Sequence, residues 1–110
     1  MGFYSNDFGN QGGTDEQIDA CTGEYNITFE HFQMDHVING SGFEARPVFK
    51  WLMSQPGYTN AWPTWNFHKY LIDRTGALVG HWSQTDDPGI DNANDPNDIP
   101  SRIAEEVAKP

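Results

Sequence analysis

The sequence has a single cysteine, few basic residues and no long apolar run. One cysteine, Cys21, excludes an internal disulfide and any zinc site built from several thiolates. Six lysine and arginine residues stand against sixteen aspartate and glutamate residues, which gives a formal charge of -10 at pH 7. Such a surface repels nucleic acid and anionic membranes, so we expect neither as a partner.

Membrane and export signals are also lacking. No apolar stretch is long enough to span a bilayer, so no membrane anchor is expected. The first residues do not combine a basic segment with an apolar one, as a signal peptide does. Together with the lone thiol, this favours a cytoplasmic location.

The chain length limits the fold to one small domain over residues 1–110. "TDEQ" at Thr14 predicts a capped helix that ends near Gly23, and residues 26–32 form a short strand-prone run. Pro47 begins a second helix that extends to about Ser54. Two strand-like runs flank "RTG" at residues 74–76 and predict a hairpin, and residues 99–110 predict a last helix. This order indicates an α/β layer that lacks its opening strand.

The apolar pattern also predicts which faces are buried. In the first helix, the helical spacing places three residues on one face, namely Ile18, Cys21 and Tyr25. The uninterrupted apolar run from Tyr70 to Ile72 predicts a strand that is buried on both faces. In the last helix, an i, i+4 apolar stripe is formed by Ile99, Ile103 and Val107.

The usual motifs of metal and hydrolase sites are absent. The histidines lack the spacing of a ligand pair, although His68 and His81 are placed to face each other across the hairpin. The acidic segment 86–98 does not follow the ligand order of a calcium loop, so we interpret it as a solvated loop. No metal site is therefore expected. Nucleophile-elbow, phosphate-loop and dinucleotide-binding motifs do not occur either.

Neighbouring polar donors remain as the candidate chemistry. Trp65 and Asn66 stand directly before the first hairpin strand, where an asparagine is unfavourable. In a structural interpretation, Asn66 caps a turn and Trp65 belongs to the core. In a chemical interpretation, their N–H groups face a ligand, together with the amide of Gln11.

The chain resembles the glutathione peroxidase family over nearly all of its length. The segments that carry the resemblance are "FYSNDFGNQGGT", "DEQIDACTGEY", "NITFEHFQMDHVING", "RPVFKWLMSQ" and, most specifically, "WNFHKYLIDRTGALVGHW". The resemblance implies a thioredoxin-like α/β fold. It also implies that Gln11, Trp65 and Asn66 correspond to the family's catalytic Gln, Trp and Asn. Cys21 is similar in position to the resolving cysteine of the thioredoxin-dependent members, and the alternative is a small buried hydrophobe.

Three departures from the family pattern follow. Ser5 stands where the family often has a second cysteine, and Asp7 stands where it has glutamine. The family's peroxidatic cysteine or selenocysteine lies in a segment that precedes the part matched here. We therefore expect the fold to be incomplete, without its N-terminal strand and nucleophile-bearing segment, and the chain to be inactive alone.

The function implied by the resemblance is thiol-dependent reduction of hydrogen peroxide or organic hydroperoxides. No cofactor is expected apart from a thiol reductant, either thioredoxin or glutathione. In the family that the chain resembles, a longer insertion between the segments around Gln55 and Trp65 accompanies tetramers, so the short connection here implies a monomer. The alternatives are a non-catalytic thioredoxin-like binding domain and a gene fragment.

Overall fold

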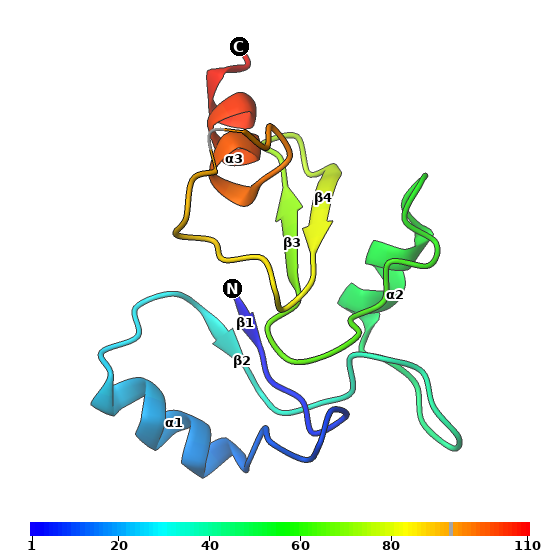
Figure 1. Cartoon of the computed structure of the whole chain (residues 1–110). Coiled ribbons are helices and arrows are strands. Elements are labelled where there is room, and N and C mark those ends of the chain that lie inside the picture. Colours follow the sequence, from blue (N-terminus) through cyan, green and yellow to red (C-terminus); the bar gives the residue numbers. More distant parts are fainter. Residues whose placement is uncertain (93) are drawn as a thin grey trace. The chain divides into compact units, whose positions relative to one another are not determined.

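A computed structural model describes residues 1–92 and 94–110 of the chain. Its helices and strands follow the order expected from the sequence, with a short strand β1 added at the start (Figure 1). The chain divides into two compact units, Met1–Ser54 and Gln55–Pro110. Each unit is described by itself below, and the expectation of a single domain stays a prediction.

The first unit contains a pair of very short parallel strands. In this pair β1 (Gly2–Phe3) lies beside β2 (His31–Phe32), with Phe3 opposite Phe32. The two phenylalanine rings stack with their centroids 4.7 Å apart. The rings of Phe3 and Phe49 meet edge to face, with their centroids 5.6 Å apart. Phe49 is buried and Phe3 is half-buried, while Phe32 is exposed, so these rings form a cluster at the edge of a core that is otherwise mostly aliphatic.

Helix α1 (Asp15–Glu24) begins at the capping box that the sequence predicts. The Thr14 hydroxyl accepts a hydrogen bond from the Gln17 amide, and the Gln17 side chain accepts one from the Thr14 amide. The predicted buried face was wrong, because Cys21 is exposed and Thr22 is buried beside Ile18. Thr22 tolerates burial because its hydroxyl donates to the Asp19 carbonyl.

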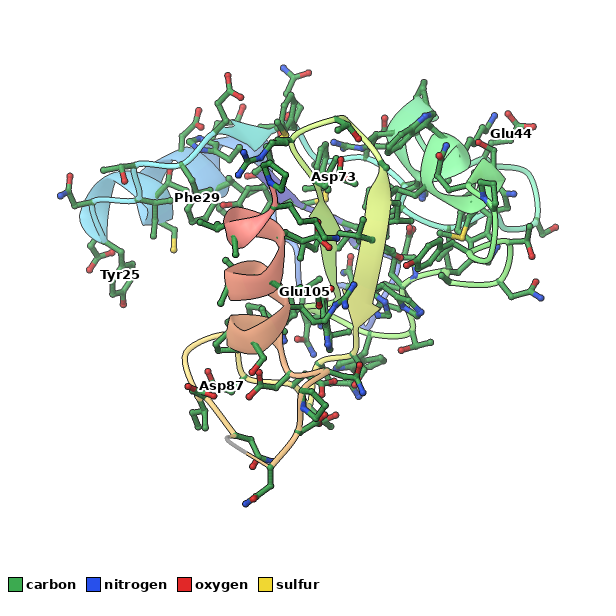
Figure 2. All side chains as sticks on the ribbon, turned by 90° about the horizontal axis from the view of Figure 1, so that it is seen from above. Tyr25, Phe29, Glu44, Asp73, Asp87 and Glu105 are labelled. Carbon is green, nitrogen blue, oxygen red and sulfur yellow. The ribbon has the colours of Figure 1, made fainter. Side chains whose placement is uncertain are left out.

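Tyr25, which was expected on the same buried face, is exposed as well. It lies just past the end of α1, where its amide donates to the Cys21 carbonyl, and its ring points away from the helix (Figure 2). The helical spacing therefore does not continue as far as this residue.

Helix α2 (Pro47–Ser54) has the bounds that the sequence predicts. Pro47 suits the first turn because a helix leaves its first amide groups unpaired, and proline has no N–H to leave. The helix buries Phe49, Leu52 and Met53, while Trp51 is exposed.

The second unit contains the predicted hairpin, formed by β3 (Lys69–Ile72) and β4 (Leu78–Trp82). Asp73, labelled in Figure 2, orders the loop between the strands by accepting hydrogen bonds from the Thr75 and Ala77 amides. The predicted burial of β3 on both faces was wrong: Tyr70 and Leu71 are half-buried and Ile72 is exposed. Among the described strands β3 pairs with β4, so it is an edge strand and not a central one.

Helix α3 (Ile99–Ala108) begins at Asp98, whose carboxylate accepts a hydrogen bond from the Ser101 amide. The i, i+4 stripe lies on this helix but is buried only at its start: Ile99 is buried, whereas Ile103 is 41% and Val107 67% exposed. A polar face of the helix is partly buried, with Glu106 buried and Arg102 half-buried. Its members are Arg102, which donates to the Val79 carbonyl at 3.2 Å, and Glu106, which is paired with Lys109 at 2.6 Å.

Within the described residues, no helix has the length and the apolar character that crossing a membrane requires.

The capping box gives a direct test of the first helix. Thr14→Ala removes the acceptor for the Gln17 amide and should lower the free energy of unfolding by about 1 kcal/mol. Thr14→Ser keeps a hydroxyl and is the matched control, which we expect to lie within a few tenths of a kcal/mol of the wild type. Urea titration followed by circular dichroism measures both. Equal stability of the two variants would show that the cap contributes nothing.

Candidate active site

Gln11 lies in an exposed loop between β1 and α1. The Asn6 side chain closes this loop, because its oxygen accepts hydrogen bonds from the amides of Gly12 and Gly13 at 2.8 and 3.1 Å. Gly12 passes so close to the chain that an added Cβ would lie 2.4 Å from the Ser5 carbonyl oxygen. The conformation around Gln11 is therefore set by its neighbours.

Asp7 fixes the base of the same loop. Its side chain is only 3% exposed and accepts hydrogen bonds from the amides of Val37 and Ile38 at 2.8 and 3.3 Å. The His36 ring contacts the other carboxylate oxygen at 2.6 Å. Burial raises the pKa of Asp7, but the hydrogen bonds from His36 and the backbone outweigh burial and lower that pKa overall.

Sequence reasoning noticed Asp7 only as a departure from the family pattern. Its role depends on contacts with residues 29 to 31 positions away, and no local motif signals such contacts.

Trp65 and Asn66 lie in a turn that precedes β3 and not in the strand itself. This agrees with the interpretation of Asn66 as a turn residue. Asn66 is half-buried, but Trp65 is exposed, so the interpretation of Trp65 as a core residue was wrong. The turn contains an unusual backbone conformation, because Phe67 has φ 61° and its ring is 82% exposed.

A positive φ is uncommon for a bulky residue, and such strain collects at functional sites. Within residues 1–92 and 94–110, the other non-glycine residues with positive φ are asparagines, Asn10 and Asn26, which adopt this conformation more readily. Phe67 is therefore the informative case. The sequence gives no sign of it, since phenylalanine itself does not favour the left-handed region.

Side chains on the two hairpin strands and next to the turn make contacts that hold the turn in place. The Tyr70 hydroxyl, on β3, donates to the Ala61 carbonyl in the segment that leads into the turn. Burial raises the pKa of Tyr70, so the hydroxyl remains a neutral donor. The rings of His68 and His81 contact each other, as the sequence predicted, with Nε2 of His68 3.1 Å from Nδ1 of His81.

Cys21 on α1 and Gln11 in the loop before α1 both belong to the first unit, while Trp65 and Asn66 are neighbours in the second unit. The structure thus brings Trp65 and Asn66 together in one turn. Their grouping with Gln11 stays a prediction. Among the described residues, no set of three or more histidine, cysteine, aspartate or glutamate side chains is gathered for a metal ion.

Comparison with known proteins decides the family. Phospholipid hydroperoxide glutathione peroxidase of Sapajus apella is 33% identical over 94 residues, which make up 82% of this chain and 46% of that protein. Glutathione peroxidase homolog BsaA of Halalkalibacterium halodurans is 38% identical over 92 residues, or 80% of this chain and 56% of that protein. The chain belongs to the glutathione peroxidase family.

No family model matches the chain. It spans about half the length of the curated glutathione peroxidases that it matches. The mixed α/β structure is compatible with the thioredoxin-like fold implied by that family.

The exposed position of Cys21 can be tested by labelling. Ellman's reagent should modify Cys21 in the folded chain at a rate within a few fold of that in urea, because no helix unfolding is needed to reach the thiol. The label is followed by its absorbance, and Cys21→Ser is the blank. Strong protection that urea relieves would place the thiol in the core.

Proposed function

We propose that this chain forms the donor part of a thiol-dependent peroxidase site, in which Gln11, Trp65 and Asn66 stabilise a thiolate that Cys21 does not supply. The substrate is hydrogen peroxide or an organic hydroperoxide. The observation that carries the proposal is the adjacent pair Trp65 and Asn66 on a strained turn, in a chain related to glutathione peroxidases over four fifths of its length.

The chemistry needs neutral N–H donors. A thiolate attacks peroxide and a thiol does not, yet a free cysteine has a pKa of about 8.5. Donors aimed at the sulfur favour its charged form, and amide and indole groups donate without adding a charge that titrates. The same groups stabilise the oxygen that leaves when the O–O bond breaks.

The proposed reaction oxidises the thiolate sulfur and reduces the peroxide. The thiolate forms a bond to one peroxide oxygen, and the other oxygen leaves as alkoxide or hydroxide and takes up a proton, giving an alcohol or water. The sulfur is oxidised to a sulfenic acid. A second thiol then condenses with it, releases water and forms a disulfide, which the reductant thiols return to the starting state.

Cys21 is suited to be that second thiol. It is exposed on α1, so it is accessible to a sulfenic acid without leaving a buried face. A disulfide brings its two Cα atoms to about 4.4–6.8 Å, so some approach of the segments is still needed. A resolving Cys21 favours thioredoxin over glutathione as the reductant. We further propose that the protein is a monomer, because the connection from Gln55 to Trp65 is short and a longer insertion there accompanies tetramers in the family. We also propose a cytoplasmic location.

The proposal predicts that the 110-residue chain has no peroxidase turnover with either thioredoxin or glutathione, because donors cannot replace the nucleophile. A coupled assay of NADPH consumption with hydrogen peroxide measures this, and the matched variant Cys21→Ser should give the same background rate. Catalytic NADPH consumption that Cys21→Ser abolishes would make Cys21 the peroxidatic residue and overturn the assignment of roles.

A further inference from the structure

His68, which follows the Trp65–Asn66 turn, and His81 of β4 form a contact that the proposed chemistry does not use. Nε2 of His68 lies 3.1 Å from Nδ1 of His81, and the two rings are tilted by only 17°. The ring centroids are 5.3 Å apart, which is long for so short a nitrogen–nitrogen distance. The two nitrogens therefore point toward each other, as in an N–H···N hydrogen bond.

The surroundings of His68 assign the proton in this bond. Nδ1 of His68 is buried and has no hydrogen-bond partner among the described residues. A proton on that nitrogen would be a buried donor without an acceptor, which is costly. His68 therefore carries its proton on Nε2 and donates it to Nδ1 of His81, and the proton of His81 lies on Nε2.

This arrangement leaves the pair no favourable place for a further proton. One vacant nitrogen, Nδ1 of His81, already accepts the hydrogen bond. The other, Nδ1 of His68, is buried. A proton added to His81 either breaks the bond or forces His68 to move its own proton to the buried nitrogen. Uptake of one proton is thus coupled to a change in the contact itself.

Neighbouring groups reinforce the neutral state. Burial lowers the pKa of His68 to about 4, and repulsion from His81 and Lys69 adds to this effect, while Asp86 opposes it. Two uncharged rings lie against the pair: the ring of Tyr70 lies near both histidines, with centroids 5.0 Å from His68 and 6.1 Å from His81, and the rings of Tyr58 and His81 meet edge to face. A hollow of about 370 Å³ beside His81 is lined by Arg102 among others.

The pair is placed where it can control the candidate site. His68 directly follows Phe67, the residue with positive φ, and lies two positions after Asn66. His81 lies on β4 opposite Tyr70 of β3, within the hairpin. The hydrogen bond therefore ties the end of the strained turn to the strand pair.

We propose that the His68–His81 hydrogen bond is a proton-sensitive latch on the turn that presents Trp65 and Asn66. It holds the turn while both imidazoles are neutral and releases it when the pair takes up a proton. The role of the latch in catalysis rests on the proposed function, but the latch itself can be measured without peroxide or thiol.

The direction of the pH effect follows from the pKa of His68. An unfolded histidine titrates near pH 6.5, so between about pH 6.5 and pH 4 the unfolded chain binds more protons than the folded one. The stabilisation from this group is therefore complete above about pH 6.5 and is lost as the pH falls toward 4. Acid should loosen the turn.

Nuclear magnetic resonance of the uniformly ¹⁵N-labelled chain tests the latch. At about pH 8, long-range ¹H–¹⁵N correlations should show both histidines protonated on Nε2, a pH at which ordinary histidines are neutral. As the pH is lowered, the indole N–H of Trp65 and the side-chain amide of Asn66 should shift with the same midpoint as the histidine pair. A His68 proton on Nδ1, or Trp65 and Asn66 signals that ignore the titration, would overturn the proposal.

Substitutions of His81 distinguish an effect of the His68–His81 hydrogen bond from an effect of ring packing. His81→Gln keeps an acceptor that does not titrate, so the turn signals should stay at their neutral-pH positions through the range in which the wild type shifts. His81→Leu removes the acceptor, so the acid-type signals should appear even at about pH 8, where wild-type histidines are neutral. His31→Gln, on the first unit, is the matched control and should leave the titration unchanged. If His81→Leu fails to fold, the wild-type titration and the His81→Gln variant still test whether the His68–His81 hydrogen bond controls the turn.

Discussion

Backbone amides in loops need acceptors, and this requirement governs the whole structure. The described strands are two to five residues long, so much of the backbone lies outside regular elements. Short Asn and Asp side chains supply the missing acceptors. The loops organised in this way are centred on Asn6, Asp7, Asn39, Asp73 and Asp98. An amide that is shielded from water and left without a partner is costly, so the part-buried bonds to Asp7, Asn39 and Asp98 constrain the path of the chain most strongly.

The same requirement gives the acidic composition a structural meaning. Burial raises the pKa of Asp7, but its hydrogen bonds lower that pKa overall, and bonds from Thr75 and Ser101 lower the pKa of Asp73 and Asp98. A lowered carboxyl pKa adds stability above the ordinary value near 3.9, and this stability is lost in acid. His68 loses its contribution in the same direction, at a higher pH. Acid therefore weakens the anchor of the Gln11 loop and the support of the Trp65–Asn66 turn alike.

Local signals predicted local structure well. The capping box at Thr14, the start of α2 at Pro47 and the hairpin around residues 74–76 each depend on neighbours within a few positions, and each was confirmed. Burial was predicted less well, because the periodicity of one segment does not say what packs against it. Cys21 and Ile103 share helical spacing with buried residues, yet Thr22 and Glu106 are buried in their place with polar partners. The anchor at Asp7 and the strain at Phe67 leave no pattern in the sequence.

In the proposed site, Trp65 and Asn66 stabilise a reactive thiolate other than Cys21. The most direct test of this role is the pKa of the peroxide-sensitive thiol in the protein purified from its native source, obtained from the pH dependence of alkylation. We expect that pKa to lie below the ordinary value of about 8.5 and to rise toward it in Trp65→Phe and in Asn66→Ala, because each variant removes N–H donors. A pKa that is unchanged in both variants would show that Trp65 and Asn66 do not stabilise the thiolate, and a reactive thiol that proves to be Cys21 would overturn the proposed roles.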